Sequence, residues 1–141
     1  LMLVQPSDHV IASLPEFHAA VMRGTAAARE GRLVTFGVRP DRPDTGYGYI
    51  QGGAAIRGIE GVLDVERFVE KPDRETARRF VDSGAFYWNS GIFLLGAQAY
   101  LDELARINAA MLDACRRAID GAGEDGDCLK LDLAAFSEAP S

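Results

Sequence analysis

Four short polar clusters carry the residues of this chain that could do chemistry. Each lies at the end of, or between, apolar runs that read as strands. They are PSDH (6–9), TGYGYI (45–50), VEKP (69–72) and WNSG (88–91). Together they supply a carboxylate that could bind a metal ion, glycines that let backbone approach a ligand, a Glu-Lys pair and a side-chain amide. These groups are typical of a pocket for a phosphorylated sugar.

Asp8 is the candidate metal ligand. Magnesium prefers hard oxygen ligands and commonly takes one or two carboxylates together with phosphate oxygens and water. A loop at the end of a strand can present such a carboxylate to a triphosphate. The alternative is that Asp8 only caps a turn, and its neighbour His9 is better explained by a structural hydrogen bond to backbone.

The second cluster has glycines at positions 46 and 48. Glycine permits a positive φ and lets its backbone N–H approach an oxygen-rich ligand closely. We expect Tyr47 and Tyr49 to project to opposite faces, so that one packs in the core and the other lines the pocket. The segment is neither a GxGxxG dinucleotide motif nor a Walker loop, and a strand edge or hairpin is the alternative.

The last two clusters supply groups suited to a sugar phosphate. Lys71 offers a point charge for phosphate, and Glu70 accepts hydrogen bonds from hydroxyl groups. We expect their side chains to point to opposite sides of the chain or to diverge. Asn89 follows Trp88 in an apolar strand, where a buried amide needs several partners. A surface ion pair for Glu70 and Lys71, and a structural hydrogen bond for Asn89, are the alternatives.

The composition is that of an ordinary globular chain. It has 141 residues, 48% of them hydrophobic and 26% charged, which suits one domain with a true core. A net charge of −6 argues against general binding to nucleic acid or an anionic membrane, because both reward clustered positive charge. No apolar run approaches the roughly 18 residues of a membrane-spanning helix.

The two cysteines bear on the cellular compartment of the protein. Cys115 and Cys128 have no histidine cluster beside them, so neither a zinc site nor a disulfide framework is predicted. Thiols of this kind suit a reducing cytoplasm, where we place the protein.

The chain begins inside an apolar run, Leu1 to Val4, and stops without a cap at Ser141. We therefore expect a fragment of a longer polypeptide.

Strands and helices alternate along the segments that position the clusters. We predict strands at residues 1–4, 33–38, 47–51, 62–69 and 86–95. A helix should begin with a capping box at Ser13 and Glu16 and stop at Gly31, and another should run from Pro72 to Gly84. Two more helices lie around Leu101 and Leu112, followed by a loop over 121–127 and a short helix over 129–136.

These elements predict an α/β fold. The first strand, the first helix and the second strand form a βαβ unit, whose strand ends meet at one edge of the sheet. Ligands of open α/β sheets bind at that edge. We expect a mixed, mostly parallel sheet flanked by helices.

In their order and spacing the clusters resemble the nucleotidyltransferase domain of the mannose-1-phosphate guanylyltransferases, including the type II phosphomannose isomerase/guanylyltransferases. The resemblance covers nearly the whole chain, through PSDHVI, LVTFGVRPDRPDTGYGYI, FVEKPD, SGAFYWNSGIFLL and LDACRRA. The second phrase and WNSGIF are highly specific, whereas FVEKP alone fits other sugar nucleotidyltransferases. The resemblance implies a Rossmann-like fold that is incomplete at both ends, with residues 1–141 as part of one domain.

The resemblance also implies the reaction of GTP with mannose 1-phosphate to give GDP-mannose and pyrophosphate, with Mg²⁺ as cofactor. Five positions match the family's site: Asp8 (magnesium ligand, catalytic), Gly48 (backbone against the sugar), Glu70 and Asn89 (sugar hydroxyls) and Lys71 (sugar phosphate, catalytic). We expect Tyr47 to form a wall of the same pocket. A sugar-phosphate oxygen would attack the α-phosphorus of GTP in line, with charge neutralised by Mg²⁺ and Lys71. No covalent nucleophile is required.

The chain departs from the family in what it lacks. The family's glycine-rich nucleotide loop precedes the first strand, its second metal-binding aspartate would follow Ser141, and many relatives add a C-terminal β-barrel with phosphomannose isomerase activity. The resemblance thus implies the sugar-phosphate half of a site, inactive as an isolated chain, and leaves a homo-oligomer of the full-length protein open. The alternatives are a non-catalytic regulatory or assembly subunit, and a nucleotidyltransferase for another hexose 1-phosphate or nucleotide.

Overall fold

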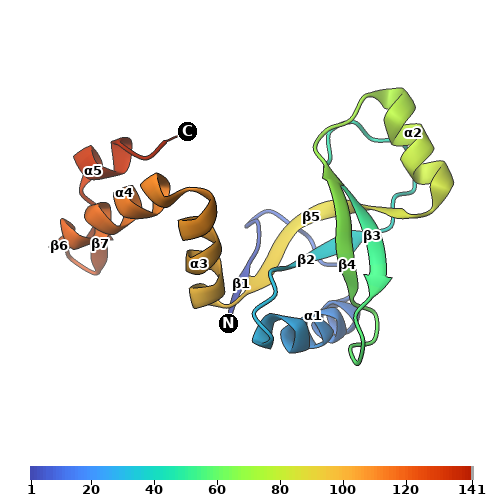
Figure 1. Cartoon of the computed structure of the whole chain (residues 1–141), viewed down its shortest axis with the longest axis horizontal. Coiled ribbons are helices and arrows are strands. Elements are labelled where there is room, and N and C mark those ends of the chain that lie inside the picture. Colours follow the sequence, from blue (N-terminus) through green and yellow to red (C-terminus); the bar gives the residue numbers. More distant parts are fainter. Residues whose placement is uncertain (141) are drawn as a thin grey trace. The chain divides into compact units, whose positions relative to one another are not determined.

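The computed structural model describes residues 1–140, which form two units (Figure 1). The first unit, Leu1–Gly96, contains every predicted site residue, and the second begins at Ala97. None of the helices described within residues 1–140 is both long enough and apolar enough to cross a membrane.

A five-stranded sheet forms the centre of the first unit (Figure 1). Its strands are β1 (Met2–Val4), β2 (Val34–Val38), β3 (Tyr49–Ala55), β4 (Leu63–Val69) and β5 (Phe86–Leu95). The long β5 pairs with β1, β2 and β3, and β4 pairs with β3. Leu94 of β5 pairs with Leu3 on one side and Val34 on the other. The longest strand of the unit therefore lies in the middle of the sheet.

The expectation of a mostly parallel sheet is wrong for these strands. Within residues 1–140 every recorded pair of neighbouring strands is antiparallel. β1 and β2 do run in the same direction, as the βαβ unit predicts, but β5 lies between them. An apolar run indicates burial and not direction, so it fits a parallel strand and a central antiparallel strand equally well.

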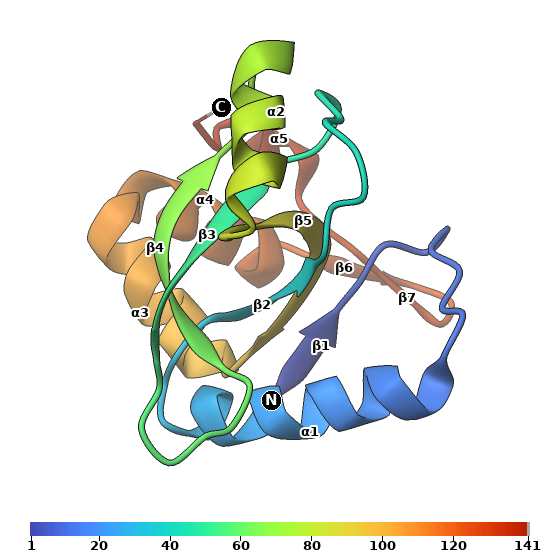
Figure 2. The same cartoon turned by 90° about the vertical axis from the view of Figure 1, so that its right-hand side faces the viewer.

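Two helices pack at opposite ends of the strands (Figure 2). α1 (Leu14–Arg29) follows Ser13 and has Pro15 in its first turn, and Gly31 follows its end with φ 83°. The predicted bounds are confirmed, but the Ser13 side chain makes no capping hydrogen bond, so that part of the predicted capping box is wrong. α1 approaches the sheet closely at Gly24, where a Cβ atom would lie 3.2 Å from Cγ1 of Val34.

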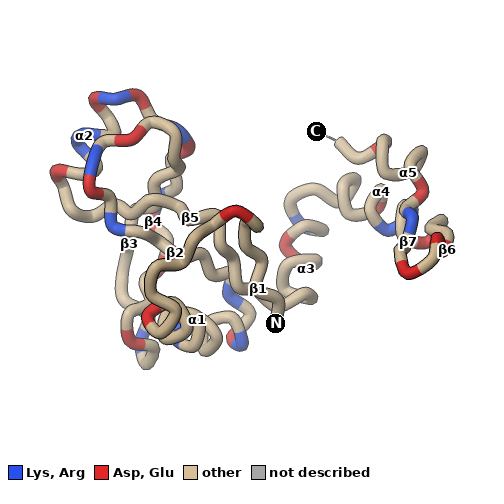
Figure 3. Tube along the Cα trace, turned by 180° about the vertical axis from the view of Figure 1, so that it is seen from behind, with Lys and Arg blue, Asp and Glu red and all other residues tan. Residues whose placement is uncertain are grey.

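α2 (Arg74–Ser83) starts and stops where predicted. Asp73 caps it, because its Oδ1 accepts a hydrogen bond from Thr76 N at 2.8 Å, and Gly84 ends it in the left-handed region. The helix contributes Ala77 and Phe80 to a core cluster that is completed by residues of β3 and β5: Tyr49, Phe86 and Trp88. Basic and acidic residues are interspersed on and around α2 rather than gathered by sign (Figure 3).

The second unit contains α3 (Ala97–Ile107), α4 (Ala109–Asp120), β6 (Gly123–Asp125), β7 (Cys128–Lys130) and α5 (Leu133–Ser137). Asn108 caps α4, as its Oδ1 accepts from Met111 N at 3.0 Å. The loop predicted over 121–127 instead contains β6 of a hairpin, whose turn uses Gly126 at φ 62°. The last helix starts later than predicted because Asp132 caps it through Ala135 N at 3.0 Å.

Candidate functional site

Three of the four polar clusters meet where β3 begins, β4 ends and β5 passes between β2 and β3. Tyr49 pairs with Val69 of β4 on one side and Trp88 of β5 on the other. The pairing register therefore places residues 45–50, 69–72 and 88–91 beside one another. The register of β2 on β5 also shifts here, between Thr35 and Gly37, and such irregularities re-aim side chains near functional sites.

Gly48 lies at the centre of this group. Its carbonyl oxygen accepts a hydrogen bond from Asn89 N at 2.8 Å. A Cβ atom on Gly48 would lie 2.6 Å from Oε2 of Glu70 and 2.8 Å from the Phe68 ring. Any larger residue would have to displace one of those side chains. The glycine is required for close approach and not for the positive φ that the sequence suggested, because Gly48 is absent from the glycines with positive φ.

Only the oxygen end of the Asn89 side-chain amide has hydrogen-bond partners within residues 1–140. Its Oδ1 accepts from Oγ1 of Thr35 at 3.0 Å and from Gly91 N at 3.3 Å. Within residues 1–140 the Nδ2 group donates no recorded hydrogen bond. The carbonyl end of the amide is thus structural, as the alternative interpretation held, while the amino end is free to donate to a ligand.

Glu70 and Lys71 lie together at the end of β4. Their Oε1 and Nζ atoms are 3.7 Å apart, and the side chains are 58% and 65% exposed, respectively. The expectation that they diverge is wrong, because Lys71 has φ 43°, the one positive value at a non-glycine residue within residues 1–140. This left-handed conformation turns the chain sharply before the buried Pro72. Such strain costs about 1–3 kcal/mol and is typical of functional sites.

Tyr47 and Tyr49 contact the same aromatic cluster. The Tyr47 ring lies 5.1 Å from the Trp88 ring, and the fully buried Tyr49 lies 5.4 Å from the Phe80 ring, centroid to centroid. The expectation of opposite faces is wrong because residues two apart in an extended segment share a face. Tyr47 stays 43% exposed, so its ring is not enclosed by the core as that of Tyr49 is.

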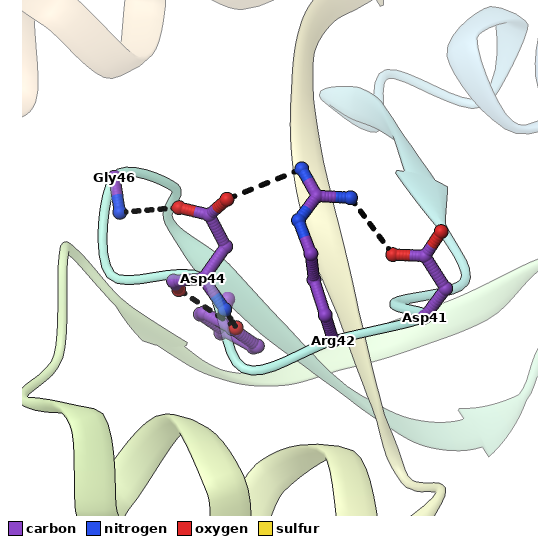
Figure 4. Close-up of polar contacts among 5 residues, drawn as sticks. Asp41, Arg42, Asp44 and Gly46 are labelled. Atoms are coloured by element: carbon purple, nitrogen blue, oxygen red, sulfur yellow. Dashed lines mark hydrogen bonds and ion pairs between the residues drawn. The ribbon is translucent and has the colours of Figure 1, made fainter.

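The segment before Gly48 carries an arginine that the sequence reasoning missed. Arg42 donates to Oδ1 of Asp41 at 2.9 Å and to Oδ2 of Asp44 at 3.2 Å (Figure 4). Its guanidinium carbon lies 5.1 Å from the Trp88 ring centroid. Desolvation lowers the pKa of Arg42, but the two carboxylates outweigh it and raise that pKa above its usual value. The signal in the sequence was an arginine between aspartates, RPDRPD, directly before the glycine cluster.

The PSDH cluster approaches the others through its proline. Gly91 of the WNSG segment has φ 70°, and a Cβ atom there would lie 3.6 Å from Cγ of Pro6. Asp8 and His9 lie beyond Pro6 in an exposed turn. Neither side chain makes a recorded hydrogen bond within residues 1–140, so the backbone hydrogen bond expected for His9 is not seen. Asp8 keeps all its oxygen lone pairs available.

Comparison with protein families gives a match over most of the chain. Residues 1–133 match the family model described as Nucleotidyl transferase. The chain belongs to the nucleotidyl transferase family. The match runs through all four polar clusters and through most of the second unit of this nucleotidyl transferase.

Curated relatives of this nucleotidyl transferase include a protein named for xanthan biosynthesis and one named as a mannose-1-phosphate guanylyltransferase. "Xanthan biosynthesis protein XanB" of Xanthomonas campestris pv. campestris (strain B100) is 51% identical over 141 residues, all of this chain and 29% of that protein. "Mannose-1-phosphate guanylyltransferase" of Escherichia coli (strain K12) is 46% identical over 142 residues, 99% of this chain and 30% of that protein. The chain spans less than a third of the length of these relatives.

Solved structures confirm the α/β nucleotidyltransferase fold. A mannose-6-phosphate isomerase from Helicobacter pylori superposes with a TM-score of 0.82 at 36% identity, over 96% of this chain and 52% of that one. A protein titled mannose-1-phosphate geranyltransferase from Thermus thermophilus superposes with a TM-score of 0.75 at 33% identity, over 86% of this chain and 35% of that one.

Nucleotidyl transferases generally use a divalent metal ion. Asp8 is suited to be a single carboxylate ligand of such an ion. Residues 1–140 contain no group of three or more His, Cys, Asp or Glu side chains that could hold a metal. A full protein cage for a metal therefore finds no support in that part of the chain. A single exposed carboxylate fits a magnesium ion that takes most of its other ligands from phosphates and water.

A cavity of about 930 Å³ lies beside this site in the nucleotidyl transferase, between α1, β2 and the β3–β4 hairpin. Apolar side chains such as Phe17, Phe36 and Ile50 line it. None of the predicted site residues is among its lining residues, but Thr35 is, and Thr35 also holds the Asn89 side chain. The cavity therefore adjoins the predicted site through Thr35 without containing it.

Proposed function

We propose that this chain forms the sugar-phosphate side of a mannose-1-phosphate guanylyltransferase site, as part of one nucleotidyltransferase domain. The reaction transfers GMP from GTP to mannose 1-phosphate and gives GDP-mannose and pyrophosphate. One observation carries the proposal: Gly48, Glu70 and Asn89 come together at the paired strands, with Asn89 N 2.8 Å from the Gly48 carbonyl oxygen. Support also comes from a relative of that name that is 46% identical to the chain.

The three grouped residues have the chemistry to bind a hexose. The Glu70 carboxylate accepts hydrogen bonds from sugar hydroxyls, and the Nδ2 group of Asn89 donates to one. Gly48 presents bare backbone, which lets a sugar ring lie closer than a side chain would allow. The partly exposed Tyr47 would form one wall of the sugar pocket.

Lys71 and Asp8 serve the phosphate groups in this proposal. Lys71 holds the phosphate of mannose 1-phosphate, one oxygen of which forms a bond to the α-phosphorus of GTP as the bond to the bridging oxygen breaks and pyrophosphate leaves. Asp8 would be a ligand of Mg²⁺, which neutralises charge on the phosphates when bound. Positioning and electrostatic stabilisation carry most of the rate, and no residue acts as a covalent nucleophile.

Calorimetric titration of the chain tests the binding half of the proposal. We expect heat on addition of mannose 1-phosphate, and weaker binding of glucose 1-phosphate and inorganic phosphate. Glu70→Gln and Asn89→Ala should each weaken mannose 1-phosphate binding about tenfold, the effect of one hydrogen bond to a charged or buried partner. Glu60→Gln, an exposed carboxylate of the β3–β4 connection, is the matched control. Equal affinity for glucose 1-phosphate would redirect the assignment to another hexose.

A turnover assay tests the transfer itself. The protein encoded by the longest natural reading frame around this chain should convert labelled GTP and mannose 1-phosphate to GDP-mannose, while the 141-residue chain should bind the sugar phosphate without turnover. An inactive protein from the full reading frame would favour the regulatory or assembly subunit. Robust turnover by the isolated chain would contradict the assignment of only one half of the site to it.

A further inference from the structure

The segment between β2 and β3 is fastened to Trp88 of β5 by a set of contacts here called the arginine brace: Asp41, Arg42, Asp44 and Trp88. Arg42 bridges the two aspartates (Figure 4). It also lies over the indole ring of Trp88. Trp88 is only 9% exposed and belongs to the core cluster. A surface segment is thereby tied to a buried side chain of the core cluster.

Asp44 extends the arginine brace to the start of β3. Its Oδ1 accepts from Gly46 N at 2.9 Å. Its backbone N–H donates to the hydroxyl of Tyr49 at 3.1 Å, and that hydroxyl donates to the Asp44 carbonyl oxygen at 2.8 Å. The chain on both sides of Tyr47 and Gly48 is therefore fixed, since Asp44 and Tyr49 hold each other across it.

A basic side chain this close to a sugar-phosphate site invites two interpretations. Arg42 could be a phosphate ligand, or it could hold the segment in place. Its charge is already shared between two carboxylates, and its guanidinium face lies on Trp88, within the roughly 6 Å at which a cation–π contact is favourable. Lys71, by contrast, has a single carboxylate partner at the longer distance of 3.7 Å.

We propose that Arg42 is a positioning residue that holds Tyr47 and Gly48 against the sugar-phosphate site and does not itself bind phosphate. The inference rests on the proposed function, because it concerns the same site. An isolated exposed ion pair contributes little, and Arg42 is 56% exposed. Its effect comes from joining two carboxylates and an indole ring in one network. Losing the guanidinium removes these three contacts together and leaves the segment held by the hydrogen bonds among Asp44, Gly46 and Tyr49 alone.

The single tryptophan of the chain reports on the arginine brace without any ligand. Arg42→Gln should shift Trp88 emission to the red and make it easier to quench with acrylamide, because the indole loses its cover. Arg42→Lys should behave similarly, since lysine keeps the charge but cannot bridge two carboxylates in a plane. Arg39→Gln is the matched control: Arg39 lies in the same segment, over the Tyr87 ring at 5.5 Å, and its loss should leave the emission unchanged.

Asp44→Asn separates the two interpretations. Asparagine can still accept from Gly46 N but no longer pairs with the Arg42 charge. If Arg42 positions the segment, this change should weaken mannose 1-phosphate binding about three- to tenfold, the range expected for a partly exposed charged network. If Arg42 binds phosphate, the same change frees its charge, and binding should tighten. Tightening would overturn the proposal.

Full-length turnover gives the remaining readout. Arg42→Gln should raise KM for mannose 1-phosphate about three- to tenfold and leave kcat nearly unchanged, because it removes preorganisation rather than a contact made in the transition state. Circular dichroism and the thermal midpoint would check that the variants fold. Equal binding by Arg42→Gln and the unsubstituted chain would overturn the positioning role alone, whereas no binding by the unsubstituted chain would overturn the proposed function as well.

Discussion

The two sides of the candidate site are built in different ways. Gly48, Glu70 and Asn89 are positioned by strand pairing and by direct contact, with a Glu70 oxygen at the distance where a Cβ of Gly48 would collide with it. Asp8 lies in an exposed turn, and only the proline two residues earlier approaches the neighbouring cluster. The sugar side of the site, Gly48, Glu70 and Asn89, is thus preorganised, whereas the Asp8 carboxylate is not held by contacts.

This difference follows from what each side must do. A sugar is recognised by several hydroxyls at once, so its ligands must be held in fixed relative positions. A magnesium ion bound mainly by phosphates and water needs only one or two protein carboxylates, which can be supplied from a loop. We therefore expect substitutions on the sugar side to alter both folding and binding, and substitutions of Asp8 to alter catalysis alone.

Asp8→Ala should have the largest effect on turnover and the smallest on stability. Loss of the metal ligand should reduce magnesium-dependent GDP-mannose formation about a thousandfold or more in the full-length protein, by analogy with the loss of one electrostatic group at a phosphoryl-transfer site. The thermal midpoint of the chain should not change, because Asp8 is exposed and makes no recorded hydrogen bond within residues 1–140. His9→Ala is the control for the turn itself. Retained turnover would show that Asp8 is not a metal ligand.

Gly48→Ala should weaken sugar-phosphate binding by the next largest factor. The new methyl group would collide with Glu70 and Phe68, at a cost of about 1–3 kcal/mol typical of overpacking. We expect at least about a tenfold loss of mannose 1-phosphate affinity by calorimetry, together with a lower thermal midpoint. Gly123→Ala is the control, since nothing lies within 4 Å of a Cβ there. An unchanged affinity would mean that Glu70 is not held by this contact.

The elements that the sequence predicted well are those bounded by residues with one strong local preference. α1 and α2 stop at glycines, Gly31 and Gly84, that take positive φ, and β5 has the bounds predicted from its apolar run. The proximity of Gly48, Glu70 and Asn89 follows the order of the clusters, as the family resemblance implied. Local chemistry and motif order were sufficient for these features.

The features that the sequence did not predict depend on tertiary contacts. Whether β5 pairs in parallel or antiparallel is decided by the path of the chain, which an apolar run does not encode. The same holds for Arg42, whose importance depends on Trp88 approaching from a strand far along the chain. Lys71 offered no signal for its positive φ, because lysine has no preference for that region.

Substitutions of Lys71 can separate strain from charge on the sugar side. Lys71→Ala and Lys71→Gly both remove the charge, and both should weaken mannose 1-phosphate binding about tenfold. Only glycine adopts φ 43° without a Cβ penalty, so Lys71→Gly should be more stable than Lys71→Ala by about 1 kcal/mol in urea unfolding. Equal stabilities would argue that the left-handed conformation stores no strain.

Asp73 lies between the sugar side of the site and α2. Substituting it should have the smallest effect on stability, and only at acid pH. Two hydrogen bonds from Thr76 hold the Asp73 pKa below its ordinary value of 3.8: the one from its backbone N–H has the larger effect, and the one from its hydroxyl the smaller. A carboxyl whose pKa is lowered on folding adds stability above its unfolded pKa and loses it as the pH falls through the folded pKa. The thermal midpoint of the chain should therefore fall more steeply below about pH 4 than that of Asp73→Asn.

The matched control for that acid titration is Asp82→Asn on the same helix, an exposed carboxyl with no recorded hydrogen bond within residues 1–140. It should keep the acid dependence of the unsubstituted chain. Because α2 supplies Ala77 and Phe80 to the cluster beneath Trp88, Trp88 emission should follow the same acid transition. If the emission and the thermal midpoint changed at different pH values, α2 and the sugar side would unfold independently. The preorganised part of the site would then be smaller than strand pairing alone suggests.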